Sequence, residues 1–528
     1  MTNTLQESLN HFALPQFKSE WGQINRGIEK ESLRVTSDGR LAQSPHPEGL
    51  GSALTHPYIT TDFSEALLEL ITPVCSSIES SLEFLTDLHS YTYANMAEGE
   101  KLWVSSMPCY VESDDKIPLA HYGSSNIGRL KTLYREGLGH RYGRLMQTIS
   151  GIHYNFSMPT EFWSEYRQIK QSSLPLQQFQ TNQYLHLIRN FHRYCWLLPY
   201  LFGASPAVCK CFTQGRAHDL DSFDEATLFK PYATALRMGN LGYKSDAQKS
   251  LFVCYNDLDN YLDSLQGAMT TPYAPYQAIG AKKGDHHLQI NTNLLQLENE
   301  FYGTIRPKRV GESGQRPLTL LRQGGVQYIE VRILDLNPFL PLGLDAQQIR
   351  FLDAFLLFCL LSESPACNPS SYYEIEENLA KVVNGGRDPE LQLSKDGVAT
   401  PFKEWAQQIL NQVGFAATLL DSLDGGEAYT QANAAQQAKL QDSELTPSAQ
   451  ILARMRAEQL SFGALTMAQS SEHEAFFKGK SISAERLAML RAASKSSFEQ
   501  QAKIEAEDTQ SFDEYLANWN ATAEEQNS

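Results

Sequence analysis

The stretch RGIEKESLRV, residues 26–35, alternates as a β-strand does, yet it carries two carboxylates, Glu29 and Glu31, two positions apart. Side chains at this spacing share one face of a strand and lie roughly 7 Å apart along the chain. Two like charges held so closely in a cleft raise each other's pKa or require a cation between them. The alternative is a solvated strand face, with Lys30 and Arg34 on the opposite side.

A second acidic cluster follows in TTDFSEALLELITPV, residues 60–74. Glu69 interrupts an apolar run that suits a core strand, and Asp62 stands at the entrance to that run. A carboxylate buried there without a partner costs several kcal/mol, so it needs a counter-ion. The alternative is an edge strand from which Glu69 points outward.

Two further segments, SGIHYNFSMP and QYIEVRILDLNPF, also alternate with period two. The first places His153 and Asn155 on one face, which suits a metal and a substrate; the alternative is a hydrogen-bonded core histidine. The second places Glu330 beside Arg332, an acid to hold a metal and a guanidinium to contact phosphate oxygens bidentately. The alternative for this pair is a cross-strand ion pair.

Together these segments supply oxygen-rich ligands for a hard cation, Mg²⁺ or Mn²⁺, in preference to zinc. The candidate metal ligands are Glu29, Glu31, Asp62, Glu69, His153 and Glu330. Such ions usually arrive with a nucleoside triphosphate, but no glycine-rich phosphate motif is present: FFKGKS has Glu474 where a Walker A loop needs glycine. If ATP binds, its phosphates contact metals and scattered basic groups, which alternatively form a solubilising surface. These groups are Lys131, Arg135, Arg306, Lys308 and Arg309.

Composition narrows the class of protein. The chain has 528 residues with 42% hydrophobic and 20% charged, which is ordinary for a globular protein with a packed core. Its net charge of −17 argues against nucleic acid and anionic lipid as partners. The N-terminus resembles no signal peptide, no apolar run is long enough for a bilayer, and the eight cysteines are scattered. We therefore expect a cytoplasmic protein with reduced cysteines.

The pattern along the chain changes near its last third. Strand-like and helical patterns mix in the first part, where LQINTNLLQLENEFY, residues 288–302, alternates with period two. Beyond residue 400, amphipathic helices open with Ser or Thr caps. We predict a mixed α+β body over 1–365 and a mainly helical portion over 366–528 packed on it, with 366–400 as the junction.

Seven blocks in fixed order resemble the bacterial glutamate-cysteine ligase family. The blocks are RGIEKESLRV, THPYITTDFSEALLELITPV, LYREGLGHRYGRLMQTISGIHYNFS, PYLFGASPA, LGY, ENEFYGTIRPKR and YIEVRILDLNPF. The likeness runs from about residue 20 to 365 and thins beyond. It implies a fold similar to the glutamine synthetase and guanido kinase group, with a curved, largely antiparallel sheet that forms an active-site funnel and helices outside it.

The resemblance also implies a reaction, the first step of glutathione biosynthesis. ATP phosphorylates the γ-carboxylate of L-glutamate, and the amine of L-cysteine attacks the acyl phosphate to give γ-glutamylcysteine, ADP and phosphate. The six acidic and histidine groups match the family's ligands for two or three metal ions, and Glu330 and Arg332 match its catalytic pair. The residues that match its amino-acid pockets are Tyr134, Gln147, Asn155, Arg237, Tyr243 and Tyr302.

One departure from the family pattern is GDHHLQIN, which leaves His286 and His287 without a role. We expect a monomer and a loop that closes over the site. We leave open the preference between Mg²⁺ and Mn²⁺ and feedback inhibition by glutathione. Two alternatives also stay open. They are a related carboxylate-amine ligase with another acceptor, and a non-catalytic cation- or nucleotide-binding regulator.

Overall fold

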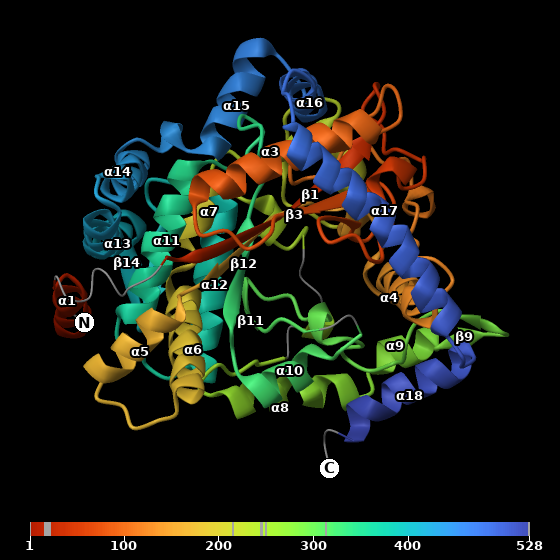
Figure 1. The fold of residues 1–528 in the computed structure, drawn as a ribbon. Coiled ribbons are helices and arrows are strands. Elements are labelled where there is room, and N and C mark those ends of the chain that lie inside the picture. The colour runs from red at the N-terminus through yellow and green to blue at the C-terminus, as the bar shows by residue number, and fades with distance from the viewer. Residues whose placement is uncertain are drawn as a thin grey trace.

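The computed structural model describes residues 2–14, 23–213, 216–242, 246–248, 251–311 and 314–525. Its centre is a seven-stranded sheet in the order β11-β12-β5-β1-β3-β2, with β4 paired to β1 (Figure 1). Each strand pair in this sheet is antiparallel. The strands are β1 (Asn25–Val35), β2 (Ile59–Thr61), β3 (Leu67–Ile71), β4 (Lys101–Leu102), β5 (Ile152–Ser157), β11 (Ile305–Lys308) and β12 (Tyr328–Leu334). The predicted mixed class with an antiparallel sheet is confirmed.

Helices and three small sheets surround the central sheet (Figure 1). The small strands are β6 (Ala207–Cys209), β7 (Asp221–Ser222), β8 (Thr227–Phe229), β9 (Lys282–Lys283), β10 (His286–His287), β13 (Gln392–Lys395) and β14 (Val398–Pro401). The helices before residue 366 are α1 (Thr2–Phe12), α3 (Ile78–Asn95), α4 (Asn126–Tyr142), α5 (Thr160–Ile169), α6 (Leu176–Tyr194), α7 (Leu197–Phe202), α8 (Leu258–Thr270), α9 (Ala274–Ile279), α10 (Pro317–Gly324) and α11 (Ala346–Leu361). All eight cysteines are free in this structure.

The two faces of the central sheet differ in chemistry. On one face Ile28 of β1 lies opposite Tyr154 of β5, and both are fully buried. The Tyr154 hydroxyl donates to Asp353 of α11, while Nζ of Lys30 lies 2.9 Å from Nε2 of His89 on α3. Helices α3 and α11 therefore cover this face. Because side chains alternate along a strand, the odd-numbered carboxylates of β1 project from the other face.

The C-terminal portion is mainly helical, but its predicted junction is itself ordered. Residues 366–400 hold α12 (Pro369–Gly385) and the hairpin of β13 and β14. Helix α12 begins where the Asn368 side chain accepts the Ser371 N–H and the Ser371 hydroxyl accepts the Asn368 N–H, a reciprocal cap. The following helices are α13 (Phe402–Asp424), α14 (Ala428–Gln441), α15 (Pro447–Glu458), α16 (Phe462–Lys478), α17 (Ala484–Glu507) and α18 (Phe512–Glu525). The division at residue 366 stays a prediction.

Caps predicted in this helical portion are confirmed. Thr446 and Ser483 each accept a backbone N–H in the first turn of α15 and α17. The sequence did not predict the cap at Ser461, which accepts a backbone N–H in the first turn of α16. Gln459 ends α15 in a left-handed conformation with φ of 55°. None of the helices in the described part of the chain is both long and apolar enough to cross a membrane.

The strand-like pattern of 288–302 is not a strand, which corrects the sequence interpretation. This segment forms bends and a short 3-10 turn. The Gln296 side chain accepts the N–H of Ile290 and donates to the carbonyl of Asn291. Polar side chains that bond the local backbone in this way compete with a sheet ladder.

Candidate active site

Strand register brings the predicted metal ligands together on the face of the sheet away from α3 and α11. Glu29 of β1 lies opposite His153 of β5, and Glu31 lies opposite Glu69 of β3. Glu330 of β12 continues the same row on the far side of β5. Because directly opposed residues in an antiparallel pair share a face, four segments far apart in sequence meet in one site.

His153 lies at the centre of this row and is only 7% exposed. Its Nδ1 lies 3.0 Å from Glu29 Oε2 and 3.9 Å from Glu330 Oε1, and its Nε2 lies 3.8 Å from Glu31 Oε1. Asn155 donates from Nδ2 to Glu29 Oε1 at 2.8 Å. Its own buried Oδ1 has no hydrogen-bond partner within the described ranges, which leaves an acceptor for a ligand.

The carboxylates of β1 and β3 repel one another. Burial raises the pKa of Glu69 well above its usual value, and the charges of Glu29 and Asp62 raise it further. Burial also raises the pKa of Glu31, which is 5% exposed and accepts the Gly151 N–H at 2.6 Å. The interpretation of this strand face as solvated is therefore wrong. Like charges directly opposed on a sheet destabilise it unless a cation lies between them.

The donor set fits a divalent cation. Glu29, Glu69 and His153 each offer one ligand atom, and these three atoms lie within 4.8 Å of one another. Within the described ranges no other group of His, Cys, Asp and Glu residues meets that spacing. Two carboxylates and one imidazole, next to further carboxylates, suit an ion that prefers oxygen.

Glu330 lies in a more basic environment than Glu31 and Glu69. Its Oε1 lies 3.4 Å from Lys308 Nζ, and its Oε2 accepts from Arg332 at 3.1 Å. Burial alone would raise the pKa of Glu330, but the charges of Lys308 and Arg332 hold it well below its usual value. Arg306 lies opposite Glu330 and is 6% exposed. The solubilising-surface alternative is therefore wrong for Arg306 and Lys308. Arg332 forms an ion pair with Glu330 within its own strand, and not the cross-strand pair of the alternative.

The predicted substrate residue Arg237 is fixed at the edge of this row by the 3-10 turn Leu236–Met238. Its guanidinium donates to Asp335 at 3.0 Å and to the carbonyls of Arg332 and Leu334. It also lies against Gly151, where an added Cβ would come within 3.0 Å of it. Glycine at 151 therefore permits this close approach.

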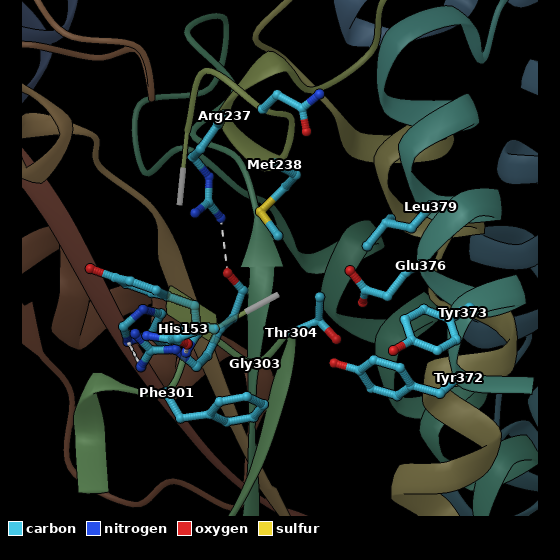
Figure 2. A pocket seen from close by; sticks show the side chains of 14 residues that line it. His153, Arg237, Met238, Phe301, Gly303, Thr304, Tyr372, Tyr373, Glu376 and Leu379 are labelled. Atoms are coloured by element: carbon cyan, nitrogen blue, oxygen red, sulfur yellow. Dashed lines mark hydrogen bonds between the residues drawn. The ribbon is translucent and has the colours of Figure 1, made fainter. Parts of the chain in front are cut away.

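A cavity of about 400 Å³ opens beside His153, Arg237 and Arg332 (Figure 2). Its opposite wall is α12, from which Tyr372, Tyr373 and Glu376 face the cavity. Sequence reasoning missed this wall because it placed α12 outside the catalytic body. The capping signal at Asn368 and Pro369 predicts the helix, but nothing in the sequence says which cavity it borders.

The remaining predicted pocket residues divide between the described and undescribed parts of the chain. Gln147 donates to the hydroxyl of Tyr302 at 3.3 Å, and Tyr302 lines the cavity. Tyr134 lies near Tyr302, and burial raises the pKa of both phenols. Tyr243 lies outside the described residues.

His286 and His287 contact helices away from this cavity. Nε2 of His286 lies 2.8 Å from Glu136 of α4, and Nε2 of His287 lies 2.7 Å from Asp513 of α18. Both histidines thus link the hairpin of β9 and β10 to neighbouring helices. This contact accounts for their presence without a role in the site.

Comparison with known proteins agrees with this geometry. The family model described as Glutamate-cysteine ligase matches residues 9–382. The chain belongs to the glutamate-cysteine ligase family. Curated ligases of that name from Pseudomonas fluorescens (strain Pf0-1) and Alcanivorax borkumensis are 49% and 50% identical over 500 and 502 residues. These alignments cover 95% and 94% of this chain, and 94% and 95% of the relatives.

Solved structures show the same likeness. The glutamate–cysteine ligase of Francisella tularensis, crystallised in complex with AMP, superposes with a TM-score of 0.90 at 36% identity over 95% of this chain and 98% of that one. A bifunctional glutathione synthetase from Pasteurella multocida shares the fold, with a TM-score of 0.69 at 23% identity over 92% of this chain and 57% of that one. The ligase family model extends to residue 382, so it includes most of α12, whereas the sequence blocks ended near 365.

Proposed function

We propose that this site joins the γ-carboxylate of glutamate to the amine of cysteine at the expense of ATP, through a γ-glutamyl phosphate. ADP and phosphate are the other products, and the reaction opens glutathione biosynthesis. The main observation in support of this proposal is a single row of acidic groups, His153 and basic groups on one face of the sheet. This row lies beside a cavity of about 400 Å³. Membership in the ligase family and the AMP complex of the Francisella tularensis relative support it.

Glu29, Glu69 and His153 would hold a divalent ion, and Glu31, Asp62 and Glu330 would complete the sites for one or two more. Mg²⁺ or Mn²⁺ bound there would screen the charge between a triphosphate and a carboxylate. In support, burial and neighbouring carboxylates raise the pKa values of Glu31 and Glu69, and a cation bound beside them would favour their ionised forms.

The basic part of the row suits phosphate. Arg306, Lys308 and Arg332 surround the single carboxylate of Glu330, so positive charge is in excess there. Burial and the charge of Arg332 lower the pKa of Arg306, whose buried Nε has no partner within the described ranges. An anion at this place would satisfy these groups. Arg332 is suited to contact the transferred phosphoryl group while Glu330 holds its fork in position.

The amino-acid substrates would occupy the cavity next to this row. Arg237 and Gln147, with the free Oδ1 of Asn155, offer partners for the carboxylate and ammonium groups of glutamate. The phenols of Tyr134 and Tyr302 would lie on the cysteine side, and Tyr243 is proposed with them from the family pattern. Binding both amino acids next to the phosphate site shortens the path of the amine to the acyl phosphate.

Other features that the family resemblance implies are also proposals. They are a likeness of the sheet to the glutamine synthetase group with a funnel-shaped site, a monomer in the cytoplasm, a loop that closes over the acyl phosphate, and feedback inhibition by glutathione. No nucleic acid or membrane partner is proposed. Water exclusion matters because an acyl phosphate hydrolyses if the amine arrives late.

Release of ADP tests the function directly. With ATP, Mg²⁺, glutamate and cysteine, we expect release that stops when either amino acid is omitted, and that is faster with cysteine than with serine, glycine or 2-aminobutyrate at equal concentration. Release indifferent to both amino acids would refute the ligase. Preference for another acceptor would support the related ligase, and metal-dependent ATP binding without product would support a regulator.

Replacing Arg332 by lysine tests the phosphate role. An ammonium cannot form the planar fork, so kcat should fall by about a hundredfold or more while the thermal midpoint changes little. Arg309→Lys is the matched control, because Arg309 donates to the carbonyls of Gly324 and Gly325 and does not line the cavity. Equal losses in both variants would show that the effect is structural.

A further inference from the structure

A second cavity, of about 540 Å³, lies against the other side of α12. The helix separates this second cavity from the active-site cavity, because different faces of α12 line the two cavities. Those toward the active site are Tyr372, Tyr373, Glu376 and Leu379. Those toward the second cavity are Ser371, Glu374, Ile375 and Asn378, which follow the three- and four-residue spacing of one helix face.

The second cavity combines apolar and aromatic side chains with many polar and charged ones. Aromatic side chains come from three helices: Tyr194 from α6, Phe358 from α11 and Trp405 from α13. Trp405 is 7% exposed, and Ile409 lies one helical turn further on. This lining suits the apolar body of a small molecule.

Two cations line this cavity without a carboxylate partner. Arg193 donates to Asn190 and to the carbonyls of Pro365 and Ala366, and it forms no ion pair within the described ranges. Burial lowers its pKa, and the nearby charges, Asp396 among them, offset this effect only in part. An unpaired, partly buried guanidinium is stabilised by a ligand carboxylate.

Lys395 is the second cation. It donates to the Gln408 amide at 3.1 Å and lies over the Trp405 ring at 5.6 Å, again without an ion pair in the described ranges. The carboxylates of Glu363, Glu374 and Asp396 also line the cavity. Glu363 and Asp396 are exposed, so water screens them, whereas the half-buried Glu374 accepts the Gly397 N–H at 3.3 Å.

A hairpin tip borders the cavity and contacts α12. Asp396 and Gly397 join β13 to β14 with φ of 53° and 78°, the conformation of a tight two-residue turn. The Gly397 N–H donates to Glu374 of α12 at 3.3 Å, and Asn378 of α12 exchanges two hydrogen bonds with the backbone of Ser394. Any ligand that moves the hairpin therefore also moves α12.

We propose that this second cavity binds a small organic carboxylate with an apolar body, and that α12 transmits its occupancy to the active site. The carboxylate lies at Arg193 and Lys395, and the apolar body lies against Trp405. Occupancy shifts α12, whose opposite face carries Tyr372 and the other wall residues of the active-site cavity. Coupling between such sites typically changes affinity by about fivefold or more.

Binding can be measured without reference to activity. The probe is 3-phenylpropionate, and its neutral amide is the matched control that lacks only the charge. The protein carries 5-fluorotryptophan at its six tryptophans, and Trp405→Phe assigns the Trp405 ¹⁹F resonance. We expect that resonance to shift saturably with the acid, with an affinity about tenfold or more above that of the amide. Saturating glutamate should not displace the probe.

Variants separate this site from nonspecific binding. Arg193→Gln and Lys395→Gln should each weaken binding of 3-phenylpropionate about tenfold. Lys403→Gln should leave this affinity unchanged, because Lys403 is exposed and does not line the cavity. An unmoved Trp405 resonance, equal affinity for acid and amide, or equal effects of all three variants would overturn the site. A saturated site that leaves the KM for both amino acids unchanged would overturn the transmission through α12.

Discussion

Replacing Glu69 by glutamine should stabilise the metal-free protein while abolishing ligase activity. A ligand oxygen of Glu69 lies within 4.8 Å of one from Glu29, and Glu31 lies directly opposite on β1. Two unit charges 4.8 Å apart repel by about 3.5 kcal/mol at an effective dielectric constant of about 20. Because Glu69 escapes part of this repulsion by binding a proton, we expect a gain of about 2 kcal/mol from its removal.

The gain is small but measurable in so long a chain. An unfolding entropy of about 2.1 cal/mol/K per residue gives about 1.1 kcal/mol/K for 528 residues, so the thermal midpoint should rise by about 2 °C. Calorimetry with EDTA measures this midpoint. With excess Mg²⁺ the thermal midpoint of the unmodified protein should exceed that of Glu69→Gln, because only the intact site gains stability from binding the ion.

Glu330→Gln is the matched control, because its carboxylate lies among cations. Its removal leaves Lys308 and Arg332 without their buried partner, which costs about 3 to 5 kcal/mol. Both variants should lose ADP release, yet their metal-free midpoints should move in opposite directions. If Glu69→Gln is destabilised with EDTA as Glu330→Gln is, the repulsive row is refuted and Glu69 is a member of a structural ion-pair network.

Three further changes test the surroundings of the site. Burial lowers the pKa of His56 to about 4, and its Nδ1 accepts two backbone N–H groups. As the pH falls below 6.5, His56 therefore binds a proton in the unfolded chain before it does so in the native protein. The free energy of unfolding falls by about 3 kcal/mol by pH 4. His56→Asn, whose amide oxygen can accept the same bonds, should flatten this loss in denaturant titrations at pH 7 and pH 4, and an unchanged slope contradicts the assignment. Gly151→Ala should push the Arg237 guanidinium from its place. The KM for glutamate should then rise about tenfold or more, with little change in the KM for ATP. Equal increases in the two KM values would indicate a general loss of the site. Tyr302→Phe removes the hydroxyl that accepts from Gln147 and should raise the KM for cysteine several-fold at unchanged thermal midpoint, whereas an effect on glutamate alone would reassign this wall.

Much of the site was predictable because its carboxylates lie on strands. Period two places Glu29 and Glu31 on one face whatever the partners of the strand are, and an acidic residue in an apolar run needs compensation in any fold. The same reasoning could not choose between a metal ligand and an ion-pair member. That choice depends on register: Glu69 lies opposite a carboxylate and Glu330 lies opposite Arg306, and no local pattern contains this information.

The strand predicted over 288–302 is wrong because that prediction rests on alternation alone. Residues 288–302 alternate, but Gln296 bonds the local backbone and the segment bends. The junction at 366–400 contains turn-forming residues, but Asn368 caps a helix there that forms a wall of the active-site cavity. Side-chain hydrogen bonds to the backbone decided both cases, and they depend on conformation more than on composition.

Strand order explains how a chain of net charge −17 can hold a polyanion. The cations Arg306, Lys308 and Arg332 come from β11 and β12 at one edge of the sheet, where they outnumber the acid Glu330. The acids Glu29, Glu31 and Glu69 come from β1 and from β3 on its far side. His153 on β5 lies between the two groups. The charge of the site therefore changes from mainly basic to mainly acidic along one row, which suits the proposed contacts with both phosphate and metal ions. Net charge sets long-range attraction, but at contact distance the few nearest charges decide what binds.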